Sequence, residues 1–237
     1  MFLLLKNDAI AIIPVIILVI GTILFVSYYF SAKQVILRKL AKTPIKSSSG
    51  IQTNAFVKVH GKALHVKEPL IAPLSGRKCI FYKLKIEKQV SNGKSAHWKT
   101  IHSEENFQEF FVDSRGDYVI VRPSKKPKKN YKSYLIKDKK MSSGAFKSPS
   151  PEFESILRNY GIDPQGLFGF NKTLRAFEGI IEVGETITVG GVAKWKNLSE
   201  PIEGYPYSRI AELVSDNNQQ LYITDDPKAL KRGKRMK

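Results

Sequence analysis

Five side chains of this 237-residue chain are the ones best suited to metal binding or nucleophilic chemistry. They are His60, His65, His97, His102 and Cys79. The histidines form two pairs, each five positions apart, and an odd separation in a strand places the two side chains on opposite faces. The cysteine stands beside Ile80 and Phe81, in an apolar setting typical of a buried and inert thiol. We therefore expect no metal site, no cofactor and no catalytic cysteine.

Other candidates for catalysis are Ser75 and the glutamates around residue 180. Ser75 lacks the G-x-S-x-G surroundings that expose a nucleophile, so we expect it to cap the strand after its turn. Glu178 and Glu182 flank a strand of alternating apolar residues. This pattern favours surface positions, or pairing of Glu178 with Arg175, over acid–base catalysis.

Most of the elements that must position these residues are predicted to be strands. Alternating apolar residues and turn signals predict strands over 55–66, 79–90, 98–101, 107–112, 118–121, 174–183, 186–194 and 221–224. A helix is predicted after Pro151, with Gly161 as its stop, and Gly190–Gly191 is predicted to be a bulge or barrel corner. The fold class is therefore mainly β, α+β at most, a barrel or sandwich with one short helix.

The N-terminal region has a different character. An uncharged, apolar run of 22 residues extends from Ala9 to Phe30 and would reach about 33 Å as a helix, enough to cross a bilayer. Pro14 and Gly21 are tolerated in membrane helices, and Tyr28, Tyr29 and Phe30 suit an interfacial aromatic belt. A cleaved signal peptide is the alternative. It normally has a shorter apolar region behind a positive segment, whereas Lys6 and Asp8 cancel within residues 1–8.

The charge of the chain, +18, is concentrated outside the expected strands. We expect a basic juxtamembrane linker over 31–50, a folded domain over 51–224 with a Lys-rich insertion at about 123–151, and a basic tail over 225–237. The basic residues expected at a membrane surface are Lys33, Arg38, Lys39, Lys42, Lys125, Lys126, Lys128, Lys129, Lys231 and Arg232. Positive residues just after the apolar run predict an outside N-terminus and a cytoplasmic domain.

Anionic lipid headgroups are the expected partner of these basic segments. Nucleic-acid binding is the alternative that a basic patch also suggests, but the runs lack interleaved aromatic residues and a recognition motif. Solvated loops that only maintain solubility are a third interpretation. Tyr131 and Tyr134 within the insertion also suggest contact with an unidentified protein partner.

Several short blocks, in order over roughly 56–193, resemble the GIDE, or Beside-A-Membrane, domain of the Mulan family of membrane-anchored E3 ubiquitin ligases. The matching positions are Gly61, Pro73, Leu74, Ser75, Gly76, Cys79, Tyr82, Glu87, Asp113, Gly116, Glu178, Gly184 and Gly191. The family's ligases also have a second membrane helix and a RING whose zinc needs many Cys and His ligands, and this chain has one cysteine. The resemblance therefore implies a RING-less, shorter and prokaryotic-type relative.

Two functional hypotheses follow. The first is a single-pass, membrane-anchored cytoplasmic domain that acts as a non-catalytic interaction or scaffolding module. The second is a ligase-like protein for ubiquitination, or a hydrolase component, whose catalytic elements come from a partner chain. A pocket that brought together His60, Cys79 or the glutamates would favour the second.

Overall fold

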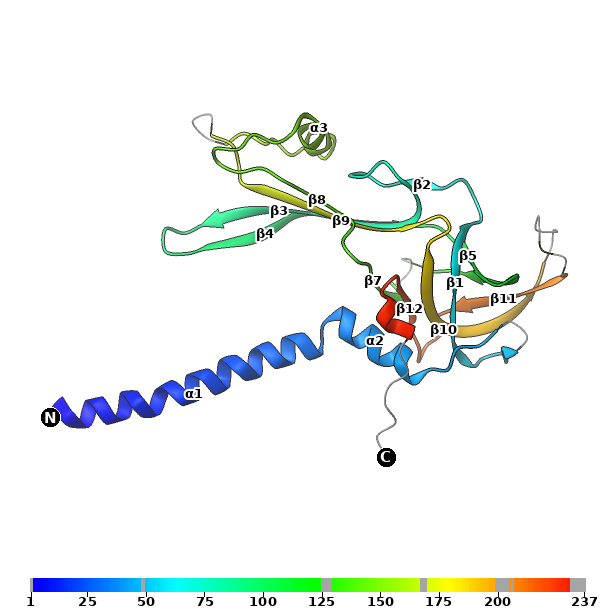
Figure 1. Ribbon diagram of the computed structural model, residues 1–237, viewed down its shortest axis with the longest axis horizontal. Coiled ribbons are helices and arrows are strands. Elements are labelled where there is room, and N and C mark those ends of the chain that lie inside the picture. Colours follow the sequence, from blue (N-terminus) through cyan, green and yellow to red (C-terminus); the bar gives the residue numbers. More distant parts are fainter. Residues whose placement is uncertain are drawn as a thin grey trace.

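The computed structural model describes residues 2–47, 50–124, 129–166, 170–198, 205 and 207–230, with side chains from residue 13 onward. The chain begins with a long helix, α1 (Phe2–Tyr29), which projects away from the rest of the molecule (Figure 1). A short break at Phe30 and Ser31 separates it from a second helix, α2 (Ala32–Lys42). The side chain of Ser31 accepts a hydrogen bond from the Gln34 N–H and caps the start of α2.

A closed five-stranded barrel forms the body of the protein. Its strands, in spatial order, are β1 (Phe56–His65), β5 (Phe110–Ser114), β6 (Asp117–Val121), β11 (Arg209–Val214) and β10 (Thr186–Asn197). The barrel closes because β10 also pairs antiparallel with β1, so that no edge remains open in the ring. Two more strands, β12 (Leu221–Thr224) and β7 (Tyr131–Tyr134), extend the sheet from β10.

A second sheet extends from the barrel (Figure 1). It contains β2 (Leu70–Ile71), β3 (Lys78–Ser91), β4 (Ala96–Phe107), β8 (Lys139–Ser142) and β9 (Leu174–Glu182). The helix α3 (Pro151–Asn159) covers one face of this sheet, where Phe153 and Leu157 pack in one cluster with Leu84 and Ile86. In Figure 1, α3 lies on the side of the sheet away from α1.

The predicted mainly β fold is confirmed, including the helix after Pro151 and its end at Gly161. The strands β2, β7, β8 and β11 were not predicted. The Lys-rich insertion contributes β7 to the barrel's sheet and β8 to the second sheet, so it is part of the fold where the structure describes it. Tyr131 is 1% exposed in β7, so its side chain is part of the core and is not accessible for the expected contact with a partner.

The segments expected to be a linker and a tail are also partly folded. α2 buries Ile36 and Leu40 completely against a 3-10 helix, η3 (Pro227–Leu230), whose Ala229 is in the same cluster. The physical reason is the spacing of Ile36 and Leu40, which puts both apolar side chains on one face of α2. An 11-residue helix is marginal by itself, so this packing holds α2 in place.

Candidate functional site

The four histidines, for which no metal site was expected, are distributed over two strands, β1 and β4. His60 Nδ1 lies 3.1 Å from the Thr188 hydroxyl, and burial, assisted by the charge of Lys58, lowers the pKa of His60. His65 is exposed at the end of β1, His97 is exposed on β4, and the His102 ring packs on Tyr160. Within the described residues, no group of three or more His, Cys, Asp or Glu side chains is placed to hold a metal ion.

Cys79 is fully buried at the start of β3. Burial, together with the negative charge of Glu178, raises the pKa of its thiol to about 12. A nucleophilic cysteine must be a thiolate at neutral pH. This thiol therefore stays protonated and belongs to the core.

Glu178 has a different position from the one expected on the surface or beside Arg175. Its carboxylate is completely buried and accepts hydrogen bonds from the backbone N–H groups of Leu74 (2.6 Å) and Ser75 (3.0 Å). It thereby holds the turn that contains the Pro73–Gly76 motif. The Ser75 hydroxyl, expected to cap the next strand, is buried without a hydrogen-bond partner in the described structure.

Arg175 pairs instead with Glu87 of the neighbouring strand, at 2.6 Å. Its guanidinium also stacks 3.8 Å from the ring of Trp98 on β4. The carboxylate of Glu87 accepts from Lys85 as well, and these hydrogen bonds outweigh its burial and lower its pKa. Both glutamates are positions of the family resemblance. Glu87 connects β3 to β9, and Glu178 connects β9 to the turn at residues 73–76.

Several glycines are needed, either because chain segments approach closely or because the backbone has a positive φ. At Gly61 a Cβ would collide with the Asp113 carbonyl of β5. Gly116 has a φ of 87° in the β5–β6 turn, and its N–H donates to the Asp113 carboxylate. Gly190 and Gly191 are not a bulge, because β1 and β10 pair through them without a register shift. A Cβ at Gly190 would lie 2.5 Å from Leu40, so its small size admits α2.

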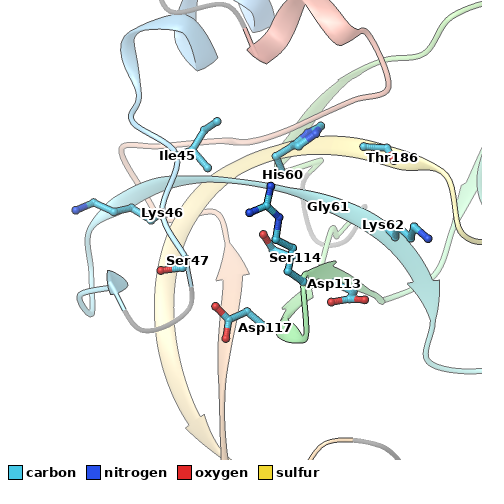
Figure 2. A pocket seen from close by; sticks show the side chains of 11 residues that line it. Ile45, Lys46, Ser47, His60, Gly61, Lys62, Asp113, Ser114, Asp117 and Thr186 are labelled. Atoms are coloured by element: carbon cyan, nitrogen blue, oxygen red, sulfur yellow. The ribbon is translucent and has the colours of Figure 1, made fainter.

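Figure 2 shows a cavity of about 800 Å³, which lies at one end of the barrel. Its lining comes from β1, the β5–β6 hairpin and residues 45–47. His60, Lys62, Asp113 and Asp117 are in this lining, but Cys79 and the glutamates are not. The cavity does not bring together the residues that a partner-assisted enzyme would need.

The contact of α2 with β7, β12 and η3, which we call the α2 junction, contains two specific sets of polar contacts. Lys58 of β1 is 1% exposed, and its ammonium group donates to the carbonyls of Leu40 (2.8 Å) and Ala229 (3.3 Å). Lys33 of α2 forms an ion pair of 2.8 Å with the buried Asp226. A buried lysine costs free energy unless it is well paired, so these contacts fix α2 to the barrel.

The end of α1 is fastened to α2 across the break. The Gln34 amide donates to the Tyr28 hydroxyl at 2.8 Å, and the Arg38 guanidinium lies 3.8 Å from the centre of the Tyr29 ring. Among the residues with described side chains, no single helix is apolar and long enough to span a membrane. Ile13–Tyr29 and Ala32–Lys42, bent by 56°, satisfy those criteria together by length and composition.

No family model, curated protein or solved structure matches this chain.

The basic residues expected at a membrane surface have several environments. Lys39 donates to the Gln219 amide oxygen at 2.6 Å, Lys129 pairs with Glu105 at 3.2 Å, and Lys42 is exposed. The remaining predicted positions, Lys125, Lys126, Lys128, Lys231 and Arg232, lie outside the described residues. The burial of Lys58 was not predicted, because a lysine that alternates with apolar residues in a strand is expected to face solvent.

Proposed function

We propose that this protein is a single-pass, membrane-anchored domain of GIDE type that acts as a non-catalytic interaction or scaffolding module at the cytoplasmic membrane surface. The observation that carries the proposal is that the apolar side chains of α1 are exposed, whereas Ile36 and Leu40 of α2 are buried. Four consecutive residues of α1, Ile17 to Ile20, are each between 50% and 70% exposed. Successive helical residues are about 100° apart, so these side chains present an apolar surface all around the helix. Such a surface is stable in lipid and costly in water.

The length of α1 fits the same role. Its 28 residues extend about 42 Å, more than the hydrocarbon core of about 30 Å. The contacts of the α2 junction then fix the position of α1 relative to the barrel. On this proposal the domain is held beside the bilayer and is not tethered by a flexible linker.

We propose a non-catalytic role because the candidate catalytic side chains have structural roles within the fold. The Cys79 thiol is buried and protonated, and Glu178 and Glu87 hold backbone and side-chain partners within the fold. The remaining surface, including the barrel end shown in Figure 2, is available for a protein partner.

Alkaline carbonate extraction of cell membranes tests the anchoring directly. We expect the full-length protein to stay in the membrane pellet and a variant lacking residues 2–29 to be released. Release of the full-length protein would contradict the proposal.

A further inference from the structure

A second cavity, of about 440 Å³, lies where α1 meets the domain. Its lining includes Phe30 at the end of α1, Ala32 at the start of α2, Lys83 of β3, Lys129, and Lys132 and Ser133 of β7. Phe30 is the last residue of the apolar run and is 68% exposed. If α1 crosses the bilayer, as we propose above, this cavity lies at the level of the lipid headgroups.

The cavity has a net positive charge. Three lysines line it, and Glu105 is the acidic side chain that pairs with two of them, Lys83 at 3.1 Å and Lys129 at 3.2 Å. Lys132 is exposed on β7. Burial lowers the pKa of Lys83 in spite of Glu105, so a further anion at this position would stabilise its charged form.

The start of α2 adds to this potential. Ala32, the first residue of the helix, lines the cavity, and the first turn of α2 contains no acidic residue. The N-terminal end of a helix carries a partial positive charge and presents backbone N–H groups, both of which favour an anion.

A buried hydroxyl points independently to a ligand. Ser133 is 6% exposed, and its Oγ has no hydrogen-bond partner in the described structure. Its own carbonyl accepts a hydrogen bond from the Lys83 ammonium at 3.1 Å, so Ser133 lies beside one of the lysines that line the cavity. An unsatisfied buried hydroxyl costs free energy, which a ligand with acceptor oxygens would recover.

We propose that this cavity binds the phosphate group of an anionic lipid in the membrane that α1 crosses. The inference rests on the proposed membrane anchoring and adds a defined site to it. The lysines and the helix terminus supply positive charge, the Ser133 hydroxyl donates to a phosphate oxygen, and Phe30 lies beside the acyl chains.

The test is a titration of the full-length protein in non-ionic detergent, with thermal unfolding as the readout. The probes are phosphatidylglycerol, phosphatidylcholine and inorganic phosphate. We expect phosphatidylglycerol to raise the melting temperature and the other two to leave it unchanged. Equal stabilisation by phosphatidylcholine, or by inorganic phosphate alone, would overturn the assignment to an anionic lipid.

Two variants separate binding from folding. Ser133→Ala removes a hydroxyl that has no partner, so without lipid it should melt at the wild-type temperature or above, yet need severalfold more phosphatidylglycerol for the same shift. Lys132→Glu should weaken the response at least about fivefold, given about 1 kcal/mol for each nearby lysine charge. Lys62→Glu, an equal charge change at an exposed position of β1, is the control and should respond as wild type.

Wild-type responses from both Ser133→Ala and Lys132→Glu would overturn the cavity proposal. If those proteins nevertheless remain in carbonate-washed membranes, the anchoring proposal stands without the lipid site. Loss of the wild-type protein from such membranes would instead contradict the anchoring itself.

Discussion

Carboxylates in this protein fasten backbone segments to one another. Glu178 accepts two N–H groups from the 74–75 turn, and Asp225 accepts the Ile136 N–H with both oxygens, at 3.0 and 2.9 Å. Both bonds connect segments that are far apart in the sequence. Their loss should therefore be seen in stability and not only in local structure.

Replacing Glu178 by Gln keeps the size of the side chain but turns one acceptor into an NH₂ group facing a backbone N–H. We expect E178Q to lose about 2–3 kcal/mol of unfolding free energy, as for a buried charge-assisted hydrogen bond. Chemical denaturation of the full chain in detergent measures this. Glu182→Gln is the matched control on the same strand. Its 3.0 Å pair with Arg77 is about 40% exposed on both sides, so the loss should stay below about 1 kcal/mol. Equal losses would contradict the role of Glu178.

Asp225 predicts a dependence of stability on pH. Burial, partly offset by the Ile136 N–H, raises its pKa from 3.8 to about 7. Between these values the folded state holds the proton that the unfolded state has released, so this carboxyl makes stability fall as pH rises from about 4 to about 7. Asp225→Asn should flatten that part of the stability curve, as measured by thermal unfolding at several pH values. An unchanged slope in the variant would show that Asp225 ionises normally in the folded protein.

At the scale of elements, α2 determines how the N-terminal helix is joined to the barrel. Its Leu40 side chain fits over Gly190 of β10, where any side chain would displace it. The contact requires a glycine in the middle of a central strand, where glycine is otherwise unfavourable.

Gly190→Ala should loosen α2, because the new Cβ would lie 2.5 Å from Leu40 and 3.3 Å from Phe56. Overpacking of this kind costs about 1–3 kcal/mol. Hydrogen exchange should show faster exchange of the α2 amides in the variant. Gly144→Ala, whose Cβ meets an ordinary contact of 3.8 Å, is the control. Exchange in α2 equal to that of the wild type would argue against this packing.

The sequence allowed prediction of the strands with clear alternation and of α3, since local pattern and turn residues decide them. It did not allow prediction of α2 as a packed helix. Its basic residues suggest a solvated linker, and Ile36 and Leu40 become core through long-range contacts with β10 and with η3, the latter almost 190 residues away. β7 was missed for a similar reason, because its parallel pairing with β12 is long-range and lysines surround its two inward residues, Tyr131 and Ser133. For the candidate site, the aromatic residues at the end of the apolar run and the basic residues after it were predicted to lie at a membrane surface. The unpaired Ser133 hydroxyl and the buried Lys58 were not predicted.

At the scale of the whole molecule, the orientation of α1 places the second sheet near any membrane that α1 crosses. The β3–β4 hairpin extends toward the same side of the barrel as α1 (Figure 1). Its tip, Asn92 to Ser95, is exposed and polar, so it suits the headgroup layer and not the hydrocarbon core. Under the anchoring proposed above, the bend at Phe30 and Ser31 sets the helix at an angle that leaves the hairpin outside the hydrocarbon core.

A spin label at Lys94→Cys tests that arrangement in reconstituted bilayers. We expect collision measurements to place the label at the headgroup level, and a label at Lys62→Cys, on the barrel, to remain in water. A label at position 94 within the hydrocarbon core, or as far from the bilayer as position 62, would contradict the arrangement. Cys79 does not interfere, because it is fully buried.

The central claim is that α1 crosses the membrane and leaves the β domain on the cytoplasmic side. The most direct measurement is labelling of Lys6→Cys and Lys94→Cys with a membrane-impermeant maleimide in intact cells and in opened membranes. We predict that position 6 is labelled in intact cells and position 94 only after the membranes are opened. Labelling of position 94 in intact cells, or of both positions only after opening, would contradict the account.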